Sequence, residues 1–107
     1  MWESDWVGST AINNDATDIT ENSAILNASV QPNSENINVS FYLWIGDFTS
    51  SSNYQTIQAN PSYILSSTKW TTVSAKATGL TSKTTYYFSI IIENDHSMYP
   101  AKSFRTL

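Results

Sequence analysis

The sequence contains no cysteine, and its 107 residues include only three glycines, three prolines and one histidine. Without cysteine the chain can form no disulfide, no thiolate nucleophile and no thiolate-based zinc site. Its stability must therefore come from the packing of side chains. The length is enough for one domain with a single core and too short for two.

Charge is also scarce. Five Lys and Arg stand against nine Asp and Glu, which gives a formal net charge of −4. The cations are scattered along the chain, so neither a polyphosphate nor an anionic membrane meets a basic cluster. We therefore exclude nucleic acid and anionic membranes as partners. The cations are Lys69, Lys76, Lys83, Lys102 and Arg105.

Long apolar runs are absent too. No segment approaches the roughly 20 apolar residues that a membrane helix needs, so we expect no membrane insertion. The first 20 residues also lack the basic and then apolar pattern of a signal peptide. Either the chain is a piece of a larger protein or it is not exported.

Hydroxyl and amide side chains are abundant instead, with Ser, Thr and Asn at 40 positions. They suit the exposed faces of strands and turns. Apolar residues alternate with them at period two, and this predicts short strands rather than helices. The expected strands are 23–30, 39–45, 54–59 (ended by Asn60-Pro61), 71–78, 86–93 and 101–107. Their expected inward residues are Ala24, Leu26, Ala28, Val30, Val39, Phe41, Leu43, Ile45, Val73, Ala75, Ala77, Tyr86, Phe88, Ile90, Ile92 and Phe104.

The beginning of the chain does not follow this alternation. Trp2 and Trp6 stand there among Ser, Asn and Asp, in a pattern that fits no strand ladder. We predict that residues 1–15 form an N-terminal arm or linker and that residues 16–107 form the domain. Trp2 and Trp6 are the candidate anchors of this arm.

The segment GLTSKTTYYFSIII, residues 79–92, is the most informative part of the sequence. Leu80 ends one strand, polar residues turn a corner, and Tyr86 begins the next strand with its ring inward. A Tyr at this position can hydrogen-bond its hydroxyl to the corner backbone, as in the tyrosine corner of immunoglobulin-like sandwiches. Short strands at this spacing favour a sandwich over an open sheet.

The succession SAILNASVQPN, FYLWIG, VSAKATGLTSKTTYYFSI and KSFRTL resembles the fibronectin type III domain, in the form common in bacterial and phage extracellular proteins. The resemblance covers about residues 16–107. It implies an all-β, seven-stranded immunoglobulin-like sandwich with Leu80 and Tyr86 as the corner pair. Ser82 and Lys83 stand where this family often has Pro and Gly.

The sequence shows no pattern of residues that is typical of a catalytic or metal site. The only histidine, His96, lies in the loop sequence Asn-Asp-His-Ser, where its neighbours point to different sides and cannot complete a hydrolytic triad. Glu93 and Asp95 share one side of a strand end, but with Asp47 they lack the spacing of a calcium loop. We expect no catalytic residue, no cofactor and no metal.

The outward face of the predicted sheet is richer. If Phe41 and Leu43 face the core, Tyr42 and Trp44 face outward, and Tyr87 and Ile91 do so on the neighbouring strand. The set Tyr42, Trp44, Tyr87 and Ile91 is a candidate interaction face. Three interpretations stay open: the rings simply stack across the sheet, the arm covers them with Trp2 or Trp6, or another domain, a second copy or a glycan docks there.

The last long loop offers a second candidate contact region through His96, Met98 and Tyr99. It carries no Arg-Gly-Asp tripeptide, so no animal cell-adhesion role is implied. The resemblance implies a non-catalytic spacer or binding module of a secreted or surface-exposed protein. One alternative is a structural subunit that self-assembles through its arm. The other is a carbohydrate-binding module that uses Tyr42, Trp44 and Tyr87. The expected partners are therefore protein domains, the chain itself or polysaccharide.

Overall fold

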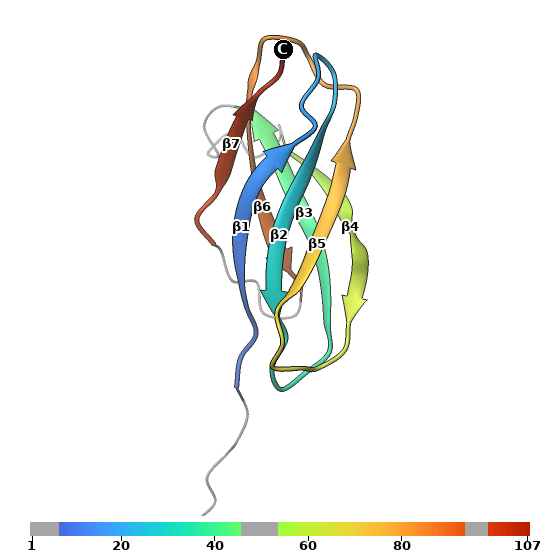
Figure 1. Cartoon of the computed structure of the whole chain (residues 1–107), viewed down its shortest axis with the longest axis vertical. Coiled ribbons are helices and arrows are strands. Elements are labelled where there is room, and N and C mark those ends of the chain that lie inside the picture. Colours follow the sequence, from blue (N-terminus) through green and yellow to red (C-terminus); the bar gives the residue numbers. More distant parts are fainter. Residues whose placement is uncertain (1–6, 46–53, 94–98) are drawn as a thin grey trace, which may run out of the picture.

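The computed structural model describes residues 7–45, 54–93 and 99–107, and this part of the chain is all-β (Figure 1). The prediction of an all-β domain is confirmed. Within these ranges, no helix has the length and hydropathy needed to cross a membrane. The strands are β1 (Thr10–Thr17), β2 (Ala24–Gln31), β3 (Ile37–Ile45), β4 (Tyr54–Ile64), β5 (Thr71–Ala77), β6 (Thr85–Ile92) and β7 (Lys102–Arg105).

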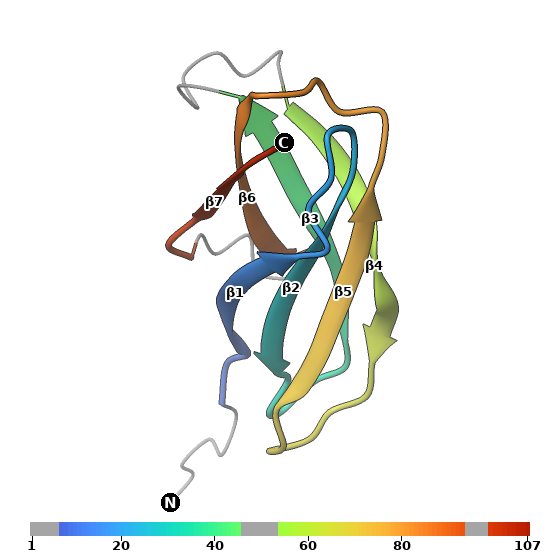
Figure 2. The same cartoon turned by 45° about the horizontal axis from the view of Figure 1, so that its top comes forward.

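The seven strands pair antiparallel in one nearly closed, barrel-like sheet, in the order β1-β2-β5-β4-β3-β6-β7. A single pair, Asn60 with Ser74, joins β4 to β5. The sheet is open between its two outer strands. There β1 and β7 lie side by side, and the two strands run in the same direction (Figures 1 and 2). We call the line between these two strands the seam.

The core follows the predicted alternation. Fifteen of the sixteen residues expected to point inward are buried, with Phe41, Phe88 and Ile90 completely so. Ile45 is the exception: it is exposed, so its assignment to the core was wrong. It is the last residue of β3, at the end of the ladder with β6.

The predicted arm contains a strand. From Thr10 onward the chain forms β1, which pairs with β2 through contacts such as Ala11 with Val30, so the expectation of an arm reaching to residue 15 was wrong. The period-two pattern of β1 is weak in the sequence, because its buried positions are a small residue, Ala11, and a polar one, Asn13. Trp2 and Trp6 lie outside the described residues.

Strand β4 also runs further than predicted. It continues past Asn60 and Pro61, whose peptide bond is cis, to Ile64. The register between β3 and β4 shifts at this point, and Asn60 pairs across to β5 instead. A proline is tolerated at such an irregularity because the local ladder does not need its missing N–H.

The tyrosine corner is present. Tyr86 is buried and its hydroxyl accepts a hydrogen bond of 2.8 Å from the N–H of Thr81, while Leu80 is buried beside it. The ring of Tyr86 stacks on Phe104 with 5.6 Å between centroids. The predicted corner pair is therefore confirmed, and it ties the start of β6 to β7.

The C-terminal residues close the same end of the molecule. The hydroxyl of buried Thr106 donates to Thr81 O (2.6 Å) and accepts from Thr84 N–H (2.9 Å). The backbone of Leu107 donates to Thr20 O and accepts from Lys83 N–H, each at 3.1 Å. The end of the chain is thus fixed against both the corner and the β1–β2 turn.

Candidate binding surfaces

The outward face of β3 and β6 carries the predicted aromatic residues. Trp44 lies opposite Tyr87 in the ladder, and their rings stack at 6.2 Å with an interplanar angle of 20°. Tyr42 packs against Tyr54 of β4 with ring centroids 4.8 Å apart. Cross-strand ring pairs of this kind stabilise a sheet whether or not they bind anything.

This face exposes less apolar surface than the sequence led us to expect. Trp44 is only 8% exposed and Ile91 is also buried, whereas Tyr87 is 36% exposed. Strands β3 and β6 each have neighbours on both sides, and Trp44 lies between Tyr54 and Tyr87 in the register. Tyr87 stacks on the indole, and the expectation of four open side chains was wrong for Trp44 and Ile91.

The predicted loop contacts have a mixed outcome. His96 and Met98 lie outside the described residues. Tyr99 is partly buried and packs against the hydrophobic core, so it does not fit the expected exposed contact. Its carbonyl accepts a long hydrogen bond from Ser89 Oγ (3.4 Å), and this holds the chain inward just before β7.

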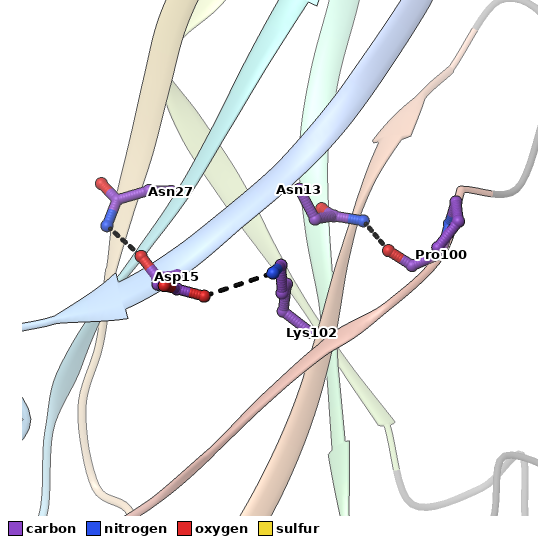
Figure 3. Close-up of polar contacts among 5 residues, drawn as sticks. All are labelled: Asn13, Asp15, Asn27, Pro100 and Lys102. Atoms are coloured by element: carbon purple, nitrogen blue, oxygen red, sulfur yellow. Dashed lines mark hydrogen bonds and ion pairs between the residues drawn. The ribbon is translucent and has the colours of Figure 1, made fainter.

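Sequence reasoning missed Asn13, the residue that holds the seam together. Its side chain is only 4% exposed and all of its hydrogen-bonding atoms are engaged. The Nδ2 group donates to Pro100 O (2.8 Å) and to Ser89 Oγ (3.2 Å), and Oδ1 accepts from Ile90 N–H (2.7 Å). Figure 3 shows the amide of Asn13 pointing across the seam at Pro100.

The position at which β7 starts explains why the Asn13 side chain is needed. The last residue of β6 that pairs with β7 is Phe88, opposite Lys102. Ile90 lies two residues further along β6, so its N–H is buried beyond the reach of that ladder. The carboxamide of Asn13 takes the place of the missing strand, because a buried N–H without a partner is costly.

The solvent side of the seam carries an ion pair. Lys102 Nζ lies 3.3 Å from Asp15 Oδ1, and both side chains are exposed (Figure 3). The backbone of Asp15 is held in turn, because its carbonyl accepts from Asn27 Nδ2 at 3.0 Å. The pair adds little stability in water, but it fixes two opposite charges at one place on the surface.

A groove of about 590 Å³ opens beside this ion pair, and we call it the seam groove. Strand β1 contributes its middle, Trp70 enters from the side of β2 and β5, and the start of β7 borders the other side. Trp70 is 51% exposed and Ile12 is 55% exposed. The lining residues are Ala11, Ile12, Asn13, Trp70, Pro100, Ala101 and Lys102.

The loop that carries Trp70 is held by hydrogen bonds to the β2–β3 end. Gln31 Nε2 donates to Thr68 O (2.8 Å), and Asn33 N–H donates to Ser67 O (2.7 Å). The indole is therefore presented from a braced loop. A lone Trp in a polar segment was the available signal for this site, but it could not indicate which strands lie beside it.

In the described part of the chain, no group of three or more His, Cys, Asp and Glu side chains comes together. Every buried side-chain nitrogen or oxygen there has a hydrogen-bond partner. Asn13, Ser89 and Thr106 are thus committed to internal bonds. The geometry of these residues is that of structural polar groups.

Comparison with solved structures shows what the chain resembles. The sensor domain of the anti-sigma factor RsgI4 in Pseudobacteroides cellulosolvens matches with a TM-score of 0.69 and 23% identity, over 94% of this chain and 96% of that one. A longer form of it matches with a TM-score of 0.67 and 23% identity, over 92% and 89%. At this identity, the likeness shows the fold alone.

A computationally redesigned β-sandwich protein is also similar, with a TM-score of 0.54 and 26% identity over 90% of this chain and 92% of that one. No protein-family model and no curated protein matches the sequence. The chain is therefore a β-sandwich or barrel-like domain of the same architecture as these structures.

Proposed function

We propose that the chain is a non-catalytic spacer and binding module of the fibronectin type III kind, within a secreted or surface-exposed multidomain protein. The strand pairing supports this finer fold assignment. Strands β1, β2 and β5 make one layer and β4, β3, β6 and β7 the other, and in the strand ladders of the described residues the pair of Asn60 and Ser74 connects the two layers. The tyrosine corner at Tyr86 lies where such a sandwich has it.

The observation that carries the spacer role is the anchoring of the chain at both ends of the sandwich. Val7 exchanges hydrogen bonds with Ser34 in the β2–β3 loop, at one end of β2. Leu107 bonds to Thr20 in the β1–β2 turn, at the other end of the same strand. The two anchored segments lie at opposite ends of the sandwich (Figure 2). Domains joined to them would therefore be held at a fixed orientation relative to one another.

One further observation supports an extracellular, non-catalytic module. The fold is similar to that of the sensor domain of the anti-sigma factor RsgI4.

Self-assembly is the alternative, and the strand order is the observation that bears on it, although the Asn13 side chain already occupies the seam at Pro100. Strands β1 and β7 lie at the two ends of the strand order, so each has a ladder partner on one side only. Open strand edges are surfaces on which a second chain can add a strand. In this proposal the N-terminal segment with Trp2 and Trp6 reaches the neighbouring copy.

Light scattering across a concentration series separates these roles. The full chain is compared with a chain lacking residues 1–6, a deletion that leaves the Val7 anchor and all of β1 in place. The spacer role predicts a monomer in both cases. A concentration-dependent oligomer that disappears with the deletion would contradict it and support the structural subunit.

Glycan binding on the outward face of Tyr42, Trp44 and Tyr87 is a weaker candidate. The burial of Trp44 leaves no large open indole on that face. Tyr54 and Tyr87 remain partly exposed on either side of it. A loss of polysaccharide binding in Tyr87→Ala would be the result in its favour.

A further inference from the structure

We propose that the seam groove binds a neutral polysaccharide, with Trp70 as the stacking platform and the Asp15–Lys102 pair as the hydroxyl-binding group. The inference rests on the proposed role as a binding module and names its ligand. The groove, of about 590 Å³, falls within the range of pockets that hold small ligands or a few sugar rings.

The apolar part of the groove suits the face of a sugar ring. Trp70 and Ile12 are both about half exposed, although each is a large apolar side chain. An exposed indole offers a flat surface that packs against the C–H face of a pyranose. Gln31 already holds the loop before Trp70 through its hydrogen bond to Thr68 O. The loop therefore loses little conformational entropy when a sugar ring docks.

The polar part suits hydroxyl groups. Sugar hydroxyls both donate and accept, so a carboxylate beside an ammonium can satisfy neighbouring hydroxyls together. Lys102 has three N–H donors and Asp15 about four acceptor sites, and their mutual contact of 3.3 Å engages only part of these. The two charges cancel, so the groove gives no advantage to an ionic ligand.

A peptide strand fits this groove less well. Adding a strand requires consecutive free N–H and C=O groups along the edge it joins. On the β7 side, Pro100 has no N–H and its carbonyl already accepts from Asn13. The side chain of Asn13 therefore blocks the ladder that an added strand would need, while the Trp70 face stays open.

Affinity electrophoresis of the full chain provides the test. Native gels contain hydroxyethylcellulose, galactomannan, arabinoxylan or dextran as neutral probes, and polygalacturonate as an anionic one. We expect retardation by at least one neutral polysaccharide. Trp70→Ala should raise the Kd at least about tenfold, because it removes the stacking surface. Trp70→Phe, which keeps an aromatic ring, should retain part of the binding.

Two more variants examine the polar half of the site. Lys102→Ala and Asp15→Ala should each raise the Kd several-fold, with unchanged circular dichroism, because both side chains lie on the surface. Tyr87→Ala is the matched control on the outward face and should bind as the parent chain does. Circular dichroism of Trp70→Ala shows whether that variant is folded.

The outcomes are distinct. Absence of retardation by every neutral probe, or stronger retardation by polygalacturonate, overturns the inference. Binding that survives Trp70→Ala but is lost in Tyr87→Ala overturns this site and leaves the module a binding domain. An oligomer in light scattering contradicts the spacer role whatever the gels show, so the two proposals fail separately.

Discussion

The hydroxyl of Tyr86 accepts a hydrogen bond from the backbone N–H of Thr81, 2.8 Å away and five residues earlier in the chain. This bond spans the corner by which the chain crosses from β5 to β6. The Tyr86 ring also stacks on Phe104 of β7, so one residue joins the corner to the edge of the sheet. The corner is therefore fixed by a side chain, in a segment that has no ladder of its own.

Removal of that hydroxyl tests its contribution. Tyr86→Phe keeps the ring and leaves Thr81 N–H without its partner, so we expect a loss of about 1–2 kcal/mol in the free energy of unfolding. Urea denaturation followed by fluorescence measures it. Tyr87→Phe, on the exposed neighbour, is the control and should change stability by less than about 0.5 kcal/mol. Equal losses in both variants would contradict the role of the corner bond.

Lys83 occupies a left-handed backbone conformation, with φ of 52°, in the same corner. A side chain there is strained by about 1–2 kcal/mol, a cost that glycine avoids. We expect Lys83→Gly to stabilise the domain by about 0.5–1 kcal/mol, after the greater entropy of glycine in the unfolded chain is included.

The control for this substitution is Lys76→Gly within β5, where glycine should cost about 0.5–1 kcal/mol. Both variants lose one positive charge, so charge alone cannot produce opposite signs. Thermal unfolding of the two proteins provides the comparison. A fall in the midpoint of Lys83→Gly would show that the φ of residue 83 carries no strain.

The core and the corner were predictable because their signals are local. Alternating residues such as Phe88 and Ile90 report a buried face within a single strand, whatever lies opposite. A corner tyrosine is recognised by its spacing from Leu80. The resemblance to fibronectin type III domains likewise depends on these local patterns, and the predicted bounds of β2, β3, β5, β6 and β7 agree with the observed ones to within two residues, whereas β1 was missed and β4 was predicted too short.

The seam was not predictable for the opposite reason. Its groove combines side chains from β1, from the residue before β5 and from the start of β7, which are far apart in the sequence. Asn13 looked like a residue of a polar arm, because only the fold reveals the unpaired N–H of Ile90 beside it. The environment of Trp44 likewise involves another strand, because the ring of Tyr87 on β6 stacks on its indole.

Substitution of Asn13 should therefore lower the stability of the fold more than substitution of most other polar residues. Asn13→Ala leaves the buried N–H of Ile90 without an acceptor, and we expect it to cost about 2–3 kcal/mol. Asn14→Ala, next in the chain, loses a bond to Ser29 Oγ (3.0 Å) at a half-buried site and should cost less than about 1 kcal/mol. Chemical denaturation measures both.

Hydrogen exchange identifies the bond itself. In the parent chain the amide of Ile90 donates to Asn13 Oδ1 at 2.7 Å and should exchange slowly. In Asn13→Ala this amide should exchange markedly faster, while the amide of Leu43, which lies in β3 between β4 and β6, keeps its protection relative to the new global stability. Unchanged protection of Ile90 would mean that another group accepts its hydrogen.

Thr106 provides the last prediction, since its hydroxyl both donates and accepts within the corner. Thr106→Val keeps the shape of the side chain but removes the donor to Thr81 O and the acceptor for Thr84 N–H. We expect a loss of about 2 kcal/mol, because two backbone groups at a buried site lose a partner together. Thr72→Val, on the exposed face of β5, should be neutral or slightly stabilising, since valine favours strands. If Thr106→Val unfolds at the same urea concentration as the parent chain, the C-terminal residues do not hold the corner, and the anchored exit on which the spacer proposal depends loses its support.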